Sequence, residues 1–402
     1  YKYKMKAFMN NTNCSINEQA ILDSGLKISN IFDVKHRVLG RYNNVKNPCG
    51  NKKYYSTYWT GSGVEFLYSG NSLKLVIESS YTQYEPWVSV DIDGCQISKQ
   101  ALNNGINLIQ LSNDLEDNKY HKIRLLKETQ FMHEDPTQTF VIEKVIYDGT
   151  FRNPEKPSLT LEFIGDSITS AEGACANASI QKYCSAIFSA WNGYPRIVSD
   201  ALNADFSVIS QAGWGIVCNC ENNPNCTLTN IYSKICKPAQ GRNIEFGCND
   251  SYKPVINTDF IVINLGTNDA TACLADEWED PKTHKKFKLS LDKNALNSSE
   301  NDFLDNESAK IVKNGVNNLL ETVRKINPDS TIIWCYGMLG NRLENLIKQS
   351  INDFCNKTSD KKIFYIELQN TSDNNLGSCS HPGKIAHKNA AQILINKIKQ
   401  LM

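Results

Sequence analysis

Hydrophobic and polar positions alternate in short runs over residues 30–150, and polar turn residues separate the runs. Typical runs are "SLKLVIESS" at 72–80, "YHKIRLLKE" at 120–128 and "FVIEKVIYDG" at 140–149. Alternation with a period of two is typical of strands with one buried face, and Gly, Asn, Asp and Ser mark the turns between them. No long amphipathic helix pattern occurs here. The pattern predicts an all-β domain over residues 1–152, a sandwich or jelly roll.

A second pattern follows a linker that contains Pro154 and Pro157. From residue 158 to 402, short apolar runs alternate with segments that are apolar at helical spacing. The runs are "LTLEFIG", "FSVIS", "FIVINLG", "TIIWCYG" and "KIFYIEL". This alternation predicts an α/β domain whose parallel sheet is flanked by helices. Two insertions interrupt it, a Cys-rich one at about 214–256 and a polar one at about 271–305.

Chemically active residue types follow four of the predicted strands. Ser167 follows the first strand, Gly213 the second, Asn268 the third and His381 the last. The carboxyl ends of parallel strands gather at one edge of a sheet, where ligands bind in such folds. Ser167 alone is equally consistent with a turn serine that caps a helix. The four positions together favour a catalytic site.

These residue types suit acyl transfer. A serine hydroxyl becomes nucleophilic when a base takes its proton, and His381 would be that base. The tetrahedral intermediate carries an oxyanion that needs donors already in place. The backbone N–H groups of Ser167 and Gly213 and the amide of Asn268 would supply them. No metal and no cofactor is needed.

The blocks "GDSIT", "AGWG", "GTND" and "HPGKIAH" resemble the four sequence blocks of the SGNH, or GDSL, hydrolase superfamily. The resemblance covers residues 158–402 apart from the two insertions. With the preceding β-domain, the chain is similar to carbohydrate esterase family 2. That resemblance implies a jelly-roll domain before an SGNH domain. It also implies a serine esterase that removes O-acetyl groups from plant cell-wall polysaccharides such as xylan and glucomannan.

One position departs from the superfamily pattern. SGNH enzymes usually carry Asp three residues before the catalytic His, and here that residue is Ser378. The resemblance to family members that lack this Asp implies that a backbone carbonyl holds the imidazole. We therefore expect a Ser167–His381 dyad, with a carbonyl or Ser378 as the orienting group. Asp373 is a more distant candidate for a third member.

Other residues near these blocks have structural or substrate-binding interpretations. Trp214 and Trp278 are candidate platforms for stacking on a sugar ring, although Trp also fills cores. Asp166 is expected to shape the strand-to-helix turn, and Asp269 is expected to have a structural role. His387, on the terminal helical segment, is expected at the surface.

Composition excludes some partners and favours export. The net charge is zero and no apolar run approaches about 20 residues, so we expect neither a nucleic-acid nor a membrane partner. The 14 cysteines favour an oxidising compartment with disulfides. Zinc binding by the cysteines at 218–248 is the weaker alternative, because their spacing lacks paired short clips. Sequons support a secreted glycoprotein; they begin at Asn10, Asn13, Asn177, Asn225, Asn249, Asn297, Asn306, Asn356 and Asn370.

The expected protein is thus a secreted, monomeric esterase that acts on an acetylated polysaccharide. Two alternatives remain open. One is an SGNH lipase or arylesterase that acts on other acyl esters. The other is a carbohydrate-binding protein that has lost catalysis, for which the missing Asp is the best support.

Overall fold

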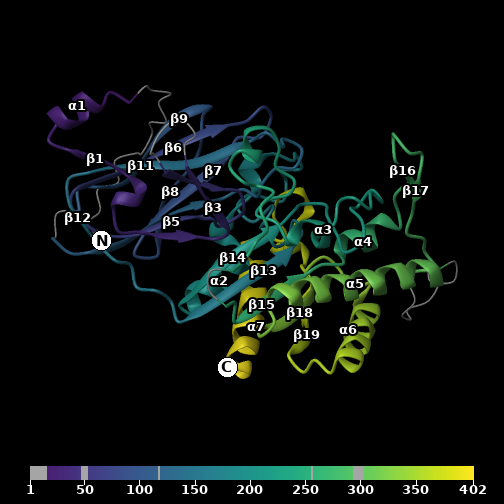
Figure 1. Cartoon of the computed structure of the whole chain (residues 1–402). Coiled ribbons are helices and arrows are strands. Elements are labelled where there is room, and N and C mark those ends of the chain that lie inside the picture. Colours follow the sequence, from purple (N-terminus) through teal and green to yellow (C-terminus); the bar gives the residue numbers. More distant parts are fainter. Residues whose placement is uncertain (1–15, 47–52, 116–117, 255–256, 293–302) are drawn as a thin grey trace. The chain divides into compact units, whose positions relative to one another are not determined.

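A computed structural model describes residues 16–402 except 47–52, 116–117, 255–256 and 293–302 (Figure 1). The chain divides into two compact units. Unit 1 comprises residues 1–156, 184–186 and 235–250, and unit 2 comprises residues 157–183, 187–234 and 251–402. Among the described residues, no helix has the length and apolar character needed to cross a bilayer.

Unit 1 contains two antiparallel sheets. The first has the order β3 (Tyr42–Lys46), β4 (Lys53–Thr57), β11 (Thr139–Tyr147), β6 (Ser72–Ser80), β9 (Gly105–Asn113), with β1 (Lys27–Asn30) paired to β11. The second has the order β12 (Thr150–Arg152), β5 (Gly63–Ser69), β10 (His121–Lys127), β7 (Trp87–Ile92), β8 (Cys95–Ala101), with β2 (Arg37–Leu39) paired to β5. Helix α1 (Glu18–Asp23) and the 3₁₀ turn η1 (Ile31–Asp33) flank β1. The all-β prediction for this region is confirmed.

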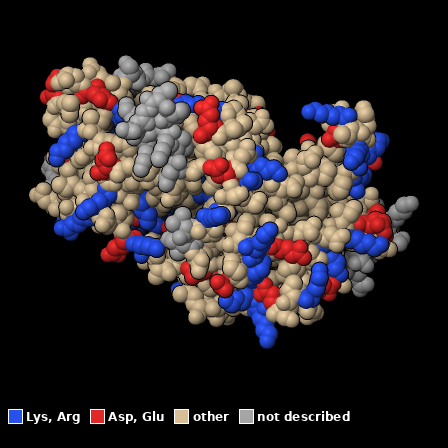
Figure 2. All heavy atoms as spheres, in the orientation of Figure 1, with Lys and Arg blue, Asp and Glu red and all other residues tan. Residues whose placement is uncertain are grey.

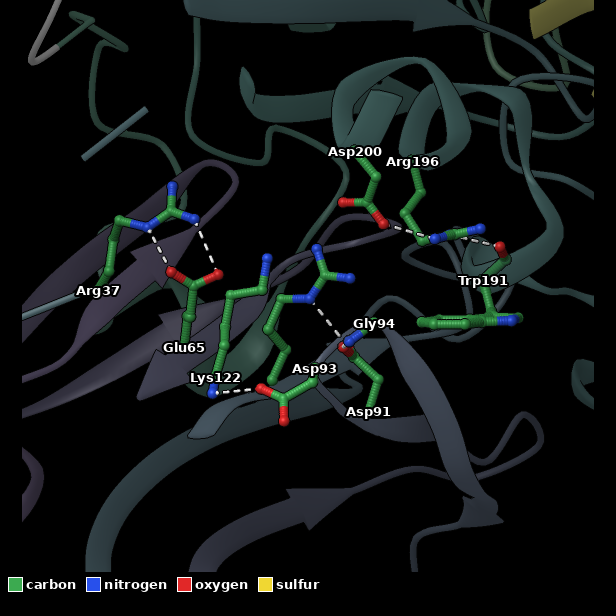
Figure 3. A network of polar contacts seen from close by, with 10 residues as sticks. Arg37, Glu65, Asp91, Asp93, Gly94, Lys122, Trp191, Arg196 and Asp200 are labelled. Carbon is green, nitrogen blue, oxygen red and sulfur yellow. Dashed lines mark hydrogen bonds and ion pairs between the residues drawn. The ribbon is translucent and has the colours of Figure 1, made fainter. Parts of the chain in front are cut away.

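The alternation in the sequence explains why the two sheets share one core. Val64 and Phe66 of β5 pack in the same buried cluster as Ile77 of β6, which belongs to the other sheet. Glu65 points the opposite way and receives two hydrogen bonds from Arg37, at 3.2 and 3.0 Å (Figure 3). This bidentate pair lies on the face of the sheet opposite the shared core. It fixes the register of β2 against β5.

A similar pairing joins β10 and β7 on the second sheet. Arg124 donates from Nε to Oδ2 of Asp91 at 2.9 Å, and both side chains are buried. The Lys122 N–H donates to Asp93 Oδ1 at 2.9 Å where the strand β7 turns (Figure 3). Both contacts join the neighbouring segments of β10 and β7. Arg124 and Asp91 can meet because their side chains project from the same face of the sheet.

Residues 235–250, which lie inside the first insertion, pack with unit 1. Trp59 Nε1 donates to the carbonyl of Ile235 at 2.7 Å, and Asn243 Nδ2 donates to Gln138 O at 2.9 Å. The ring of Phe246 meets Tyr54 edge-on, with centroids 5.6 Å apart. The sequence pattern places this segment in the second domain, because nothing in its composition shows which domain it contacts.

Unit 2 contains a parallel five-stranded sheet, as predicted. Its order is β14 (Ala204–Ser210), β13 (Leu159–Gly165), β15 (Phe260–Asn264), β18 (Thr331–Gly337), β19 (Ile363–Leu368). The helices are α2 (Tyr194–Ala201), α3 (Leu228–Tyr232), α4 (Thr267–Ala272), α5 (Asn306–Ile326), α6 (Glu344–Thr358) and α7 (Lys384–Leu401). The second insertion forms the hairpin of β16 (Trp278–Glu279) and β17 (Lys286–Phe287). Short 3₁₀ turns are η2 (Ser185–Ile187), η3 (Ala190–Asn192), η4 (Gly241–Ile244), η6 (Asp373–Asn375) and η7 (Ser378–Ser380).

Helices cover both faces of this sheet. Phe163 of β13 packs with Tyr194 of α2 and Leu394 of α7 in one buried cluster. Glu162, its neighbour, points to the other face, where it accepts hydrogen bonds from Tyr232 of α3 and from Ser207. Helices α3 and α5 pack together, as do α5 and α6 (Figure 1). The strand order reverses between β13 and β15, so the ends of these two strands are where a ligand site is expected.

Candidate active site

Ser167 lies in a tight turn that begins at the last residue of β13, which is a glycine. A Cβ on Gly165 would lie 1.9 Å from Oγ1 of Thr169, so only glycine allows the chain to turn this closely. After the turn, the Ser170 N–H donates to Asp166 O and the Glu172 N–H to Ser167 O, both at 3.0 Å. These bonds hold Ser167 at the carboxyl end of the sheet.

Ser167 and His381 meet although they lie far apart in the sequence. Oγ of Ser167 is 2.8 Å from Nε2 of His381, a hydrogen-bond distance. Nδ1 of His381 is 2.8 Å from the carbonyl oxygen of Cys379. Since that carbonyl can only accept, Nδ1 carries the proton and Nε2 is the acceptor for the serine hydroxyl.

The turn before His381 is unusual in its backbone. Cys379 and Ser380 have φ of 51° and 56°, so two consecutive residues with side chains adopt the left-handed region. Such conformations persist where the surrounding structure enforces them. Here the N–H of Cys379 donates to Ile180 O at 2.9 Å and that of His381 donates to Ser378 O at 3.1 Å. The result is a Cys379 carbonyl that points back at the imidazole.

The other two candidate orienting residues lie elsewhere. Ser378 is fully buried, and its hydroxyl has no hydrogen-bond partner among the described residues. Asp373 is exposed at the start of η6. Of the three groups considered from the sequence, the backbone carbonyl is the one that contacts Nδ1 of His381.

Asn268 lies on the first turn of α4, after β15. Its Nδ2 donates to Trp214 O at 2.8 Å and, over a longer distance of 3.3 Å, to Oδ2 of Asp166. The first bond fixes the amide plane. The second N–H is more weakly engaged, so it is the one that an oxyanion could receive.

Gly213 lies in the loop after β14 and has φ of 76°. A Cβ there would meet only Sγ of Cys220, at an ordinary 3.6 Å. The glycine is therefore required by the backbone conformation and not by lack of space. The N–H of Cys220 donates to Gly213 O at 2.9 Å and closes this loop.

Two buried carboxyl groups support the loops. Asp269 accepts hydrogen bonds from the N–H groups of Ile216 and Val217, and burial raises its pKa to about 6. Asp166 accepts from the N–H of Ile168 at 2.9 Å, and burial raises its pKa to about 7. Asp166 binds the turn after β13, and Asp269 holds the loop at Ile216 and Val217, which agrees with the turn role expected for Asp166 and the structural role expected for Asp269.

Burial also sets the protonation of His381. Desolvation lowers the pKa of its imidazole, and the hydrogen bond to the Cys379 carbonyl opposes this effect. The net result is a lowered pKa, so the ring is neutral near pH 7. A neutral imidazole with a free lone pair toward Ser167 is the state that a general base requires.

His387 differs from its prediction. The residue is completely buried on α7 and not at the surface. Its Nδ1 accepts from the N–H of Tyr194 at 3.3 Å, and its ring stacks on that of Tyr194 with an interplanar angle of 15°. Burial, followed by the charge of His381, lowers its pKa to about 3. The helical spacing does indicate this inward orientation, because His387 precedes Ala391 by four residues and Leu394 by seven and so lies on the apolar face of α7.

The two tryptophans occupy different environments. Trp214 is only 6% exposed, which leaves little ring surface for a sugar. Trp278 is half-buried on the β16–β17 hairpin, where it is the cross-strand partner of Phe287.

Sequence reasoning missed Glu172. This side chain is buried, and its Oε2 lies 3.7 Å from Nε2 of His381. Glu172 belongs to none of the four blocks, so no sequence signal pointed to it.

A pocket of about 420 Å³ opens beside the turn that carries His381. The polar groups in its lining are four side-chain amides and one ammonium group, and the rest of the lining includes alanine, leucine and isoleucine: Asn177, Asn192, Asn374, Asn375 and Lys384 carry the polar groups. Amides can both donate to and accept from hydroxyl groups.

Across the described part of the chain, no set of three His, Cys, Asp or Glu side chains converges to hold a metal ion. The structure also shows no disulfide among the described cysteines, in contrast to the pairing expected from their number.

Comparison with known proteins places the chain in a family. No family model matches it. An acetyl xylan esterase, Est2A, from the rumen bacterium Butyrivibrio proteoclasticus has a similar solved structure. The two are 32% identical, the TM-score is 0.86, and the match covers 93% of this chain and 98% of Est2A. The chain belongs to carbohydrate esterase family 2.

Two further relatives agree with this assignment. The cellulase/esterase CelE of Acetivibrio thermocellus is 25% identical over 353 residues, which are 85% of this chain. The chain spans only 37% of the length of CelE. A family 2 carbohydrate esterase from Clostridium thermocellum, solved with cellohexaose, shares the fold with a TM-score of 0.72, 22% identity and coverage of 91% of this chain and 98% of that one. As a member of this family, the chain is classed with the carbohydrate esterases.

Proposed function

We propose that this protein is a secreted serine esterase that removes O-acetyl groups from plant cell-wall polysaccharides. The observation that carries the proposal is the 2.8 Å contact between Ser167 Oγ and His381 Nε2, with Nδ1 held by the Cys379 carbonyl. Similarity to an acetyl xylan esterase supports the acyl group and the polymer. The amide-lined pocket beside the His381 turn suits a hydroxyl-rich sugar.

The mechanism has two acyl-transfer steps. In the first, Ser167 Oγ attacks the acetyl carbonyl while Nε2 of His381 takes the serine proton. The sugar oxygen leaves and receives that proton from His381. In the second, His381 takes a proton from water, the hydroxide attacks the acetyl-serine, and acetate leaves as Ser167 regains its proton.

The oxyanion of each intermediate would lie among three donors. These are the backbone N–H groups of Ser167 and Gly213 and the Nδ2 of Asn268. The bond from Asn268 to Trp214 O fixes the amide before substrate arrives, so little reorganisation is needed in the transition state.

Export of the protein has independent support. Six sequons, at Asn177, Asn225, Asn249, Asn306, Asn356 and Asn370, have exposed asparagines, whereas those at Asn10, Asn13 and Asn297 lie outside the described residues. Cys236 and Cys248 are adjacent, because the N–H of Cys236 donates to Cys248 O at 2.8 Å. Oxidation could join this pair.

The deciding experiment measures acetate release from acetylated xylan and from acetylated glucomannan. Wild type is compared with Ser167→Ala and with Ser350→Ala, a matched change on α6 where the hydroxyl only donates to Leu346 O. We expect release by wild type and Ser350→Ala and none by Ser167→Ala. A folded wild type that releases no acetate would reject the proposal. Activity on longer acyl esters alone would indicate a lipase or arylesterase, and binding without turnover would indicate a carbohydrate-binding protein.

A further inference from the structure

The carboxylate of Glu172 lies beside the nitrogen that would receive the serine proton. Oε2 of Glu172 is 3.7 Å from Nε2 of His381, and the Glu172 side chain is only 5% exposed. The N–H of Glu172 donates to Ser167 O at 3.0 Å, so the backbone of the nucleophile turn also positions Glu172. The contact is therefore built into the same turn that presents Ser167.

The imidazolium form of His381 needs a source of negative charge. In serine hydrolases an Asp at Nδ1 both orients the ring and stabilises its positive charge. Here Nδ1 meets the neutral carbonyl of Cys379, which can orient the ring but carries no charge. A carboxylate in a site with little water acts on a nearby charge far more strongly than one at the surface.

We propose that Glu172 is a positioning residue whose negative charge stabilises the imidazolium form of His381 during acyl transfer. The orienting and charge-bearing roles that one Asp normally combines are thus divided between the Cys379 carbonyl and Glu172. This inference rests on the proposed roles of Ser167 and His381.

Other titratable groups lie near Glu172 and His381 and interact electrostatically with one or the other. Asp166 lies close enough for the charge of Glu172 to contribute to its raised pKa. Cys220 is affected by Glu172 in the same direction. His387 faces His381 from α7, and its pKa is lowered in part by that ring. Burial keeps His387 and Cys220 neutral near pH 7 and raises the pKa of Asp166 to about 7, and Glu172 is the carboxylate that lies against Nε2 of His381.

The test is the pH profile of kcat/KM with p-nitrophenyl acetate for wild type, Glu172→Gln, Glu172→Asp and Glu321→Gln. Glu321 is an exposed carboxylate on α5 and serves as the matched control. For Glu172→Gln we expect kcat to fall about 10- to 100-fold with KM nearly unchanged, since a charge effect on a proton-transfer step has this size. The acidic limb should move to lower pH by about one unit, because the imidazolium loses a partner. Glu172→Asp should restore part of both effects, and Glu321→Gln should match wild type.

A loss of activity without movement of the acidic limb would overturn the inference, because a purely structural role changes the amount of active enzyme and not the pKa of His381. If Glu172→Gln does not fold, Glu172→Asp decides. It keeps the charge but withdraws it by one methylene, so a limb that stays at the wild-type pH rejects the proposal and a limb shifted to lower pH supports it. Failure of the proposed function is recognised separately, since wild type would then show no activity dependent on Ser167.

Discussion

The carbonyl oxygen of Cys379 lies 2.8 Å from Nδ1 of His381, two residues further along the chain. The contact depends on left-handed backbone at Cys379 and Ser380. A main-chain carbonyl thus occupies the hydrogen-bonding position at Nδ1 that a carboxylate holds in a Ser-His-Asp triad. Because the carbonyl belongs to the turn itself, the imidazole ring is held in place without an Asp at position 378.

Removing the imidazole should abolish catalysis but not folding. For His381→Ala we expect kcat on p-nitrophenyl acetate to fall by about 10²- to 10⁴-fold, the usual contribution of a general base. In wild type, kcat/KM should fall on acidification with an apparent pKa below 6.5, because burial lowers the pKa of His381. Steady-state rates from pH 4 to 9 test both statements. An acidic limb well above pH 6.5 would assign it to another group.

Asn268→Ala should slow the chemical step. Loss of one oxyanion donor typically lowers kcat by about 10²- to 10³-fold, and KM should change little because the donor acts mainly in the transition state. The amide also joins Trp214 O to Asp166, so the thermal midpoint should be measured alongside. Equal effects on kcat/KM and on the fraction of folded protein would argue against the oxyanion role.

Gly213→Ala tests the backbone donor after β14. The position has φ of 76°, where a Cβ costs about 1 kcal/mol or more. Since the Cβ would meet no close atom, we expect a small loss of stability together with a larger loss of kcat as the loop shifts. The control is Gly25→Ala beside α1, where φ is 80° and a Cβ would meet nothing within 4 Å. Similar activity losses in both variants would contradict the assignment.

The sequence predicted much of this arrangement for a physical reason. A parallel sheet brings its strand ends to one edge, so residues after β13 and β15 must be neighbours once the strands are recognised. The contact of Ser167 with His381 needs more than this rule, because β15 and β18 lie between β13 and β19 and His381 follows the last residue of β19, Leu368, by thirteen residues. The order of apolar runs was enough to find all five strands of the parallel sheet in unit 2.

Other features depended on contacts that no local pattern encodes. The backbone at Cys379 is left-handed although the position is not a glycine, so the sequence does not indicate this turn. Glu172 is placed beside His381 by a buried turn that belongs to none of the four sequence blocks. Residues 235–250 pack with unit 1 through contacts with residues far away in the sequence, such as the bond from Trp59 to Ile235 O and the edge-on contact of Phe246 with Tyr54.

Asp166 should make the protein less stable as the pH rises. Burial raises its pKa from 3.8 to about 7, so the folded state holds a proton that the unfolded state loses between these values. Stability from this group is complete below pH 3.8 and declines until about pH 7, by at most about 4 kcal/mol. Denaturant titrations of wild type and Asp166→Asn at pH 4.5 and 8 measure it. The difference between the two pH values should be smaller in the variant, and an equal difference would show that Asp166 does not titrate in this range.

Cys236 and Cys248 should form a disulfide when the protein meets an oxidising disulfide such as oxidised glutathione. The two thiols would give up two electrons and two protons, and two glutathione thiols would be released. Both side chains are buried, and the Cys248 thiol donates to the carbonyl oxygen of Ala239 at 3.3 Å. The backbone N–H of Ala239 contacts the Cys236 thiol, so both thiols lie against the same residue. Closing this short loop would stabilise the folded state by about 3 kcal/mol. Peptide mapping without reduction should link the two cysteines, with Cys335, buried in β18, as the control that stays a thiol. Recovery of Cys236 and Cys248 as separately alkylated thiols after such treatment would reject the pairing.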